Sequence, residues 1–390
     1  MTPSSLLTFE PRRLAGRTVS AIGAGCWTIG GSATNRGVPI GWDGVDPDKA
    51  YAALEAAAEL GVNFFDTADV YGLGASERLL GRLLKRLLTQ LPRKDVVISS
   101  KVGYFAGTAA HPYAPMQMRH QLETTLTNLG LDRLDVYFLH SADFGPGDRY
   151  LGAAAEQMRA FQEEGLIGAV GMRAPHAWAQ EWAEEWTVSS ELSGRAGQAR
   201  RFLHLFFTLR PKVLAVRHNL LSRRYHSGET DVFEFAAAHD VEVIIKQPLA
   251  QGLLTGSHTP DLIRNVSSSD HRSIDPQFQP AVIRAVHEAL ADVAAFFSFD
   301  RADLVRVALR YALQHAPQAP VLVGFRDAAQ ISMNLTCLGA PLTSDEVTLL
   351  RNVTEEAARV VDSLPRFRPG TWPIPPTLPT TSGPVQEGHQ

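Results

Sequence analysis

A chain of 390 residues ordinarily divides into two or three domains, although α/β barrels of ~250 residues or more form a single unit. Apolar residues make up 45% of the chain and charged residues 20%, the balance of a globular protein with ample material for a core. The net charge is −4 with both signs mixed throughout, so nothing points to a nucleic-acid or membrane partner.

The cysteine content and the N-terminal sequence indicate the cellular compartment in which we expect the protein. The chain has only Cys26 and Cys337, which excludes a disulfide framework and a Cys-rich metal site, and we expect no metal. Residues 1–10 lack a charged segment followed by an apolar core, and no apolar run is long enough to span a bilayer. We therefore expect a protein of the reducing cytoplasm.

The first elements follow from local signals. Residues 12–14 and 19–22 flank Ala15-Gly16-Arg17, which predicts a hairpin that closes one end of a barrel. A first barrel strand is expected at 21–25. After a loop, Asp46-Pro47 is typical of a helix start, with an N-cap followed by proline at the first helical position.

From there, short β-rich runs alternate with longer helical runs, which predicts βα units and a parallel sheet. The count reaches eight strand–helix units with additions, so the predicted fold class is an α/β protein, a (β/α)8 TIM barrel with an N-terminal hairpin, long mouth loops and a Pro-rich C-terminal tail. After the first strand, we expect strands at 62–65, 96–100, 134–139, 167–171, 213–216, 241–245 and 321–323. We expect helices from about 76, at 116–129, 151–164, 231–239, 281–297 and 301–315, and from Thr343.

Three segments stand apart from this alternation. Between 174 and 211, Trp178, Trp182 and Trp186 recur at helical spacing, which favours an aromatic helix face packed on the barrel over a binding platform. Residues 257–279 are too long for a plain connection and predict a functional loop over the barrel mouth. From 365 onward the chain is rich in Pro, Thr and Gly, so we expect a barrel domain at 1–364 and a flexible tail at 365–390.

Polar side chains stand where three successive strands end. Asp66 follows the strand at 62–65, with Tyr71 five residues further in the loop, while Lys101 and His140 end the next two strands. Each alone is more readily explained by a structural role, such as capping a loop. In a parallel barrel, however, all strand C-termini open on one face, which would gather the four side chains in a single pocket.

Together these residues resemble the aldo-keto reductase superfamily, from about residue 12 to residue 361. The resemblance implies a catalytic tetrad of Asp66, Tyr71, Lys101 and His140. The motifs that carry it are Asp66-Thr-Ala-Asp-Val-Tyr71-Gly72, Ser100-Lys101-Val102-Gly103, Leu139-His140, Pro248-Leu-Ala-Gln-Gly-Leu-Leu-Thr-Gly256, and Gly324-Phe-Arg326 followed by Gln330 and Asn334.

The implied chemistry agrees with these residue types. Reduction of a carbonyl by hydride leaves an alkoxide that needs a proton, and a phenol with a pKa of ~10 is a poor donor at neutral pH. A neighbouring Lys101 ammonium is expected to lower the pKa of Tyr71, and Asp66 would hold Lys101 charged and in place. His140 would orient the carbonyl.

The resemblance also implies a nicotinamide dinucleotide, bound extended and without a Rossmann fold. Arg326 lies in a loop before a helix N-terminus, a position that suits a 2′-phosphate, so NADPH is preferred, with NADH as the alternative. Leu249 and Gln251 match positions whose backbone contacts the pyrophosphate. The full implied cofactor set is Trp27, Asp66, Leu249, Gln251, Gly324, Arg326, Gln330 and Asn334.

The sequence departs from the family around the nicotinamide. Where relatives usually have Gly-Val-Ser-Asn, this chain has Gly171-Met172-Arg173-Ala174, and Arg217 and Lys246 stand where Gln and a ring-stacking aromatic are usual. One interpretation is a cationic cluster that recruits an anionic substrate. The other is structural, with an arginine paired to an acid such as Asp143 and Lys246 packing only its stem.

The predicted function is therefore NADPH-dependent reduction of an aldehyde or ketone, or the reverse oxidation, with a small carbonyl compound as substrate. The alternative is a low-turnover barrel that binds nucleotide or a partner. The intact tetrad favours the enzyme and the altered nicotinamide pocket favours the alternative. Oligomeric state is not encoded in these patterns.

Overall fold

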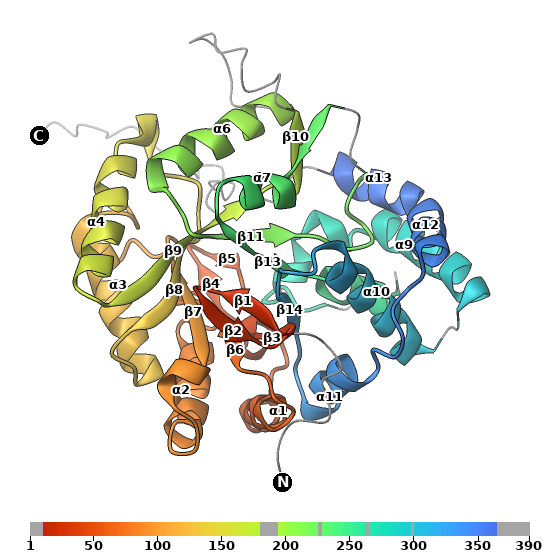
Figure 1. The fold of residues 1–390 in the computed structure, drawn as a ribbon, viewed down its shortest axis with the longest axis horizontal. Helices are drawn as coiled ribbons and strands as arrows, with labels where there is room; N and C mark the ends of the chain where they lie inside the picture. Colours follow the sequence, from red (N-terminus) through yellow and green to blue (C-terminus); the bar gives the residue numbers. More distant parts are fainter. Residues whose placement is uncertain are drawn as a thin grey trace, which may run out of the picture.

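The computed structural model describes residues 11–179, 194–224, 228–259, 261, 266–297 and 300–364. Eight parallel strands form a closed barrel in which each strand pairs with its neighbours in the chain and the last pairs with the first (Figure 1). This confirms the predicted (β/α)8 barrel. The strands are β3 (Ile22–Gly25), β6 (Phe64–Asp66), β7 (Val97–Val102), β8 (Leu134–Leu139), β9 (Ile167–Ala174), β11 (Val213–Arg217), β13 (Glu242–Lys246) and β14 (Val321–Gly324).

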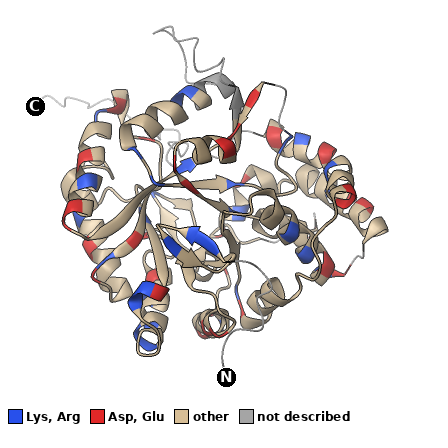
Figure 2. Ribbon diagram, in the orientation of Figure 1, with Lys and Arg blue, Asp and Glu red and all other residues tan. Residues whose placement is uncertain are grey.

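Helices surround the barrel in an outer ring (Figure 1), and charged residues of both signs are interspersed along them (Figure 2). None of the helices in the described ranges is both long and apolar enough to cross a membrane. The helices are α1 (Pro47–Glu59), α2 (Ala75–Leu87), α3 (Pro115–Leu129), α4 (Leu151–Glu163), α6 (Gly194–Leu209), α7 (Val232–Ala238), α9 (Pro280–Phe296), α10 (Arg301–His315), α11 (Ala328–Thr336), α12 (Ser344–Val353) and α13 (Glu355–Ser363).

The local signals read from the sequence act as expected at two helix starts. The Asp46 carboxylate accepts hydrogen bonds from the backbone N–H groups of Asp48 and Lys49 at the start of α1. Thr343 and Glu346 form a reciprocal capping box at the start of α12. These caps define where the two helices begin.

The predicted hairpin closes the N-terminal end of the barrel. Its strands β1 (Arg12–Leu14) and β2 (Arg17–Val19) pair antiparallel. Leu14 and Val19 pack against the side chains that fill the barrel interior, including Phe64 and Phe138. The opposite end, where the strands finish, is therefore the open face.

One expectation is wrong. Trp178 does not lie on a helix, because residues Ala177–Ala179 form β10, which pairs antiparallel with β12 (Glu229–Asp231). The helical spacing of the tryptophans was outweighed by pairing with a segment some fifty residues later, which no local pattern reveals. Trp182 and Trp186, like the tail at 365–390, lie outside the described residues.

A buried carboxylate fastens the closed end of the barrel. Asp135 in β8 is 2% exposed and accepts a 2.8 Å hydrogen bond from the backbone N–H of Ile98 in β7. The same carboxylate forms ion pairs at 2.9 Å with Arg93, which precedes β7, and with Arg17 of the hairpin. One side chain thus joins the hairpin to two barrel strands.

We expect Asp135→Asn to lower the free energy of unfolding by about 2 kcal/mol, because the amide cannot balance two arginines and the ion pairs are partly exposed to solvent. The measurement is urea denaturation. Asp132→Asn, a change at an exposed neighbour, is the matched control and should stay within about 0.5 kcal/mol of the wild type. Equal losses in the two variants would contradict the role of Asp135.

Candidate functional site

The structure brings the four predicted tetrad residues together at the open end of the barrel. Asp66 ends β6, Lys101 lies near the end of β7 and His140 directly follows β8. The Lys101 ammonium lies 2.6 Å from the Asp66 carboxylate and 5.0 Å from the centre of the Tyr71 ring. The Tyr71 and His140 rings face each other edge to face at 6.0 Å. The four side chains therefore share one cavity wall.

Tyr71 owes its position to two glycines. Gly72 has φ near +61°, a left-handed conformation that favours glycine, and a Cβ on Gly72 would collide with the carbonyl of Gly30. Likewise, a Cβ on Gly30 would press against the Tyr71 backbone. The close contact between these loops fixes the backbone of Tyr71 above the barrel mouth.

The Asp66–Lys101 pair is further supported by hydrogen bonds. The Ser99 hydroxyl donates to the Asp66 carboxylate at 2.6 Å, and the Lys101 ammonium donates to the carbonyl of Thr67 at 2.6 Å. Burial lowers the pKa of Lys101 and Asp66 acts against that effect. The pair is thus a buried ion pair in which each member makes one further hydrogen bond.

The surroundings of Tyr71 differ from the sequence-based expectation. Burial raises the pKa of Tyr71 well above 10, Asp66 raises it further, and among the neighbouring charges it is Arg173 that lowers it. The resting phenol is therefore protonated at neutral pH. A protonated phenol is able to donate a proton, whereas a phenolate is not.

His140 is neutral under the same conditions. Burial lowers the pKa of His140 well below 6.5, and the positive charges of Arg173, Lys101 and Lys246 lower it further. Within the described residues its Nδ1 atom has no hydrogen-bond partner. A neutral imidazole with an unused ring nitrogen is suited to hydrogen bonding a ligand oxygen.

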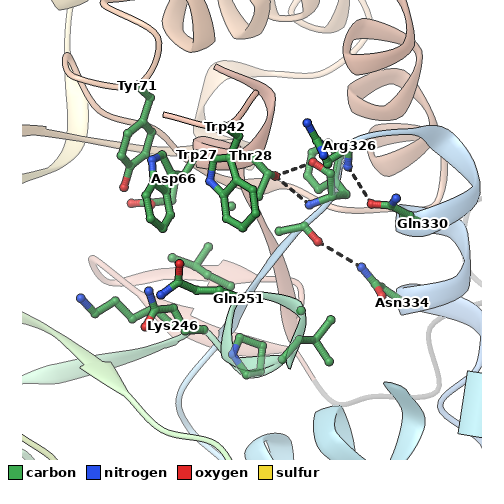
Figure 3. Close-up of a pocket in the computed structure, with 18 of the residues that line it drawn as sticks. Trp27, Thr28, Trp42, Asp66, Tyr71, Lys246, Gln251, Arg326, Gln330 and Asn334 are labelled. Atoms are coloured by element: carbon green, nitrogen blue, oxygen red, sulfur yellow. Dashed lines mark hydrogen bonds between the residues drawn. The ribbon is translucent and has the colours of Figure 1, made fainter. Parts of the chain in front are cut away.

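A cavity of about 340 Å³ joins the tetrad to the loop after β14. Figure 3 shows Tyr71 and Asp66 at one end and Arg326, Gln330 and Asn334 at the other, with Trp27 and Trp42 between them. All the residues that the family resemblance assigned to the cofactor line this cavity, namely Trp27, Asp66, Leu249, Gln251, Gly324, Arg326, Gln330 and Asn334.

The Arg326 end of the cavity is preorganised by short contacts. The backbone N–H of Arg326 donates to the Gln330 side chain at 3.0 Å, and the backbone N–H of Phe325 donates to the Thr28 hydroxyl at 3.0 Å. The Arg326 guanidinium donates to the carbonyl of Asp43. Sequence reasoning missed Thr28, since a threonine beside Trp27 carries no distinctive pattern.

Residues 266–279 form part of the mouth, as the length of the 257–279 segment suggested. His271 packs against Trp27 and Trp42, each with ring centres 4.5 Å apart, and its Nε2 atom lies 2.7 Å from the Gln251 side-chain oxygen. Asp270 accepts a 2.8 Å hydrogen bond from the backbone N–H of Asp43. The segment is thereby tied to the loop after β3 and to the loop after β13.

A second cavity of about 310 Å³ adjoins the first at the tetrad. Arg173 from the end of β9 and Lys246 from the end of β13 line both cavities, whereas Arg217 from the end of β11 lines the second. The three cations therefore point to the open face, as their strand positions predicted. Asp143 is not their partner: its carboxylate accepts from the backbone N–H of Gly145.

A sequence model of the aldo/keto reductase family matches residues 21–355. The chain belongs to this family. It is 25% identical to an L-galactose dehydrogenase of Arabidopsis thaliana, covering 92% of this chain and 94% of that protein. It is 23% identical to an NADH-specific methylglyoxal reductase of Escherichia coli, covering 88% and 97%.

Solved structures show the same fold. A glycerol dehydrogenase from Gluconobacter oxydans superposes with a TM-score of 0.64 at 23% identity, covering 88% of this chain and 94% of that one. An aldo/keto reductase from Klebsiella pneumoniae, solved in complex with NADP and acetate, gives a TM-score of 0.56 at 21% identity, covering 89% and 96%. As a member of this family, the chain is an NAD(P)-dependent oxidoreductase.

The hydrogen bonds of the Asp270 carboxylate, which connect residues 266–279 to the loop after β3, lead to a prediction. Burial alone would raise the pKa of Asp270, but hydrogen bonds from Arg272 and from the backbone of Asp43 lower it to about 2. The tie is therefore complete above pH ~4, the range in which the unfolded carboxyl is also ionised, and is lost as the pH falls through about 2. At neutral pH it can be removed only by mutation.

We expect Asp270→Asn to speed amide hydrogen exchange at pH 7 by roughly tenfold or more in residues 266–278 and 41–44, since charge-assisted hydrogen bonds contribute about 1.5–3 kcal/mol. Mass spectrometry of proteolytic fragments measures this. Asp292→Asn, an exposed position on α9, is the control. Unchanged exchange in Asp270→Asn would show that the rings of His271 and Trp27 hold the segment without it.

Proposed function

We propose that this protein reduces an aldehyde or ketone with NADPH, or carries out the reverse oxidation, and that Tyr71 donates the proton. The observation that carries the proposal is the 2.6 Å Asp66–Lys101 ion pair beside Tyr71, with His140 across the same cavity. The cofactor, when bound, supplies the hydride that reduces the carbonyl carbon. The protein's own residues supply position, electrostatic support and the proton.

Protonation states support these roles. Burial raises the pKa of Tyr71, so that the phenol keeps its proton until an alkoxide develops on the substrate. The Lys101 ammonium, held by Asp66, then stabilises the phenolate that remains. Neutral His140 donates a hydrogen bond to the carbonyl oxygen and fixes its orientation toward Tyr71.

The residues present fit a dinucleotide at its phosphate end. No carboxylate in the described part of the chain forms an ion pair with Arg326, whose guanidinium donates to the neutral carbonyl of Asp43. Burial lowers the pKa of Arg326, and the positive charge of nearby Arg272 lowers it further. Because Arg272 is paired with Asp270, it is Arg326 that supports recognition of a 2′-phosphate and hence a preference for NADPH.

At the nicotinamide end the donor set is cationic. Arg173 and Lys246 line this part of the cavity, where neutral side chains are usual in relatives. Burial lowers the pKa of Lys246 well below 10.5. The positive charges of Arg173, Arg217 and Lys101 lower it further. Because such repulsion is relieved by a counter-charge, we propose that the substrate is anionic.

We expect Tyr71→Phe to lower turnover by roughly 10²-fold or more while leaving cofactor affinity nearly unchanged, because the variant lacks only the transferable proton. Steady-state kinetics and NADPH fluorescence titration give the two quantities. Tyr113→Phe, which removes a buried hydroxyl bound to Ser141 outside the cavity, is the matched control. Near-normal turnover of Tyr71→Phe would exclude Tyr71 as the donor. Wild-type protein that binds NADPH but reduces no carbonyl compound would instead favour the binding barrel.

Arg326→Ala should weaken NADPH binding by roughly one to two orders of magnitude and leave NADH binding almost unchanged, because charge-assisted hydrogen bonds contribute about 1.5–3 kcal/mol. Fluorescence titration with each cofactor measures the two affinities. Arg284→Ala on the exposed face of α9 controls for net charge. Equal losses for both cofactors would assign Arg326 to a group other than the 2′-phosphate.

A further inference from the structure

We propose that the substrate is a 2-oxo acid with an apolar side chain, and that Arg173 and Lys246 hold its carboxylate directly beside the carbonyl group that is reduced. This inference rests on the proposed function and specifies where its anionic group lies. The distribution of charge along the second cavity carries the argument.

Arg173 lies at the reacting end of the cavity. Burial raises the pKa of Tyr104 and the positive charge of nearby Arg173 acts against that effect, while the Tyr104 ring packs edge to face on His140 with centres 4.6 Å apart. Arg173 also lines both cavities together with Tyr71 and His140. Its guanidinium is thus adjacent to the place where the carbonyl oxygen must lie to reach Tyr71.

Lys246 adds a second basic group on the same side, and an anion bound beside it would favour its charged form. It lines both cavities, and no hydrogen bond or ion pair to its side chain is found in the described ranges. The carboxylate of Asp66, which acts on Lys246, is already engaged by Lys101 and Ser99. Arg173 and Lys246 are therefore two basic groups at the inner end of the cavity, and no carboxylate in the described ranges is paired with Lys246.

The outer end of the second cavity is balanced by contrast. Asp275 and Asp362 line it and act on Arg217, which donates to Gln277 at 3.3 Å. Arg223 is paired with Glu229. A substrate anion placed far from the carbonyl would meet these carboxylates, whereas an anion bonded to the carbonyl carbon would meet Arg173 and Lys246.

Part of the remaining wall is apolar, alongside polar side chains such as Gln247, Gln251 and His176. Ile40, Val70 and Leu221 are 4–7% exposed and line the second cavity. Their surface suits an aliphatic substituent on the far side of the carbonyl. A carboxylate, a carbonyl and an aliphatic chain in this order describe a 2-oxo acid.

The reaction balances without a further reagent. The reduced nicotinamide, when bound, would supply the hydride and its two electrons to C2, the π electrons would move onto oxygen, and that oxygen would take the Tyr71 proton, which solvent restores. The product is a 2-hydroxy acid, and the carboxylate keeps its charge throughout.

The test compares 4-methyl-2-oxopentanoate with its methyl ester, in full-length protein with NADPH. The C2 ketone of the methyl ester is more electrophilic than the C2 ketone of the acid anion, so chemical reactivity alone favours reduction of the ester. We expect kcat/KM for the acid to exceed that for the ester by about tenfold or more at low ionic strength, and the ratio to fall as salt is added. A ratio at or below one would overturn the inference.

Two variants assign the ratio to residues. Arg173→Met and Lys246→Met should each lower the acid-to-ester ratio by about tenfold, whereas Arg36→Met, an exposed arginine of the neighbouring loop, should leave it unchanged. Calorimetric titration with oxamate, an unreactive analogue of a 2-oxo acid, gives a readout independent of turnover. Oxamate binding that is equal in wild type and both variants would overturn the assignment.

The outcomes separate this inference from the proposed function. Reduction of the ester and of neutral aldehydes without preference for the acid would overturn the 2-oxo acid and leave the reductase intact. Preference for glyceraldehyde 3-phosphate over glyceraldehyde, with none for the 2-oxo acid, would place the anion at the outer end and likewise overturn it. Failure to bind NADPH, together with no turnover, would overturn both.

Discussion

The buried ion pair between Asp66 and Lys101 is the interaction on which the site depends. Two opposite charges at the ends of adjacent parallel strands, 2.6 Å apart, are stable in the barrel mouth only because Ser99 and the Thr67 carbonyl complete their hydrogen bonds. The pairing of β6 with β7 sets the distance, since Asp66 lies opposite Ser99 in the register. Without Asp66, burial would favour the neutral form of Lys101. Tyr71 would then lack the positive charge that, in the proposed mechanism, stabilises its phenolate.

Much of this arrangement was accessible from the sequence. The alternation of β-rich and helical runs predicted the barrel, because each short apolar run must be covered by a helix to be buried. Once the barrel is assumed, residues that end successive strands share a face, which brought Asp66, Lys101 and His140 together without any further information. The same rule correctly directed Arg173, Arg217 and Lys246 to the mouth.

Features that depend on pairing between distant segments, or on the balance of burial and charge, could not be predicted from the sequence. Trp178 follows a helical pattern but pairs with Thr230 in a strand, and His271 joins Trp27, Trp42 and Gln251 across three separate loops. The protonation of Tyr71 was expected to follow its nearest cation, Lys101. In the structure burial has the largest effect and raises the pKa of Tyr71, so the phenol is protonated at neutral pH. Neither effect is encoded in residue spacing.

The charge balance of the mouth links the two halves of the site. Burial lowers the pKa of Lys246, and repulsion from Arg173, Arg217 and Lys101 lowers it further, while the Asp66 carboxylate acts against them. A barrel that places uncompensated cations there sacrifices folding stability, because each must leave water without a partner. An anion that enters the cavity restores that loss, so its binding energy is larger than its own contacts supply. Under the proposal of an anionic substrate, the ligand would complete the electrostatics of this end of the cavity.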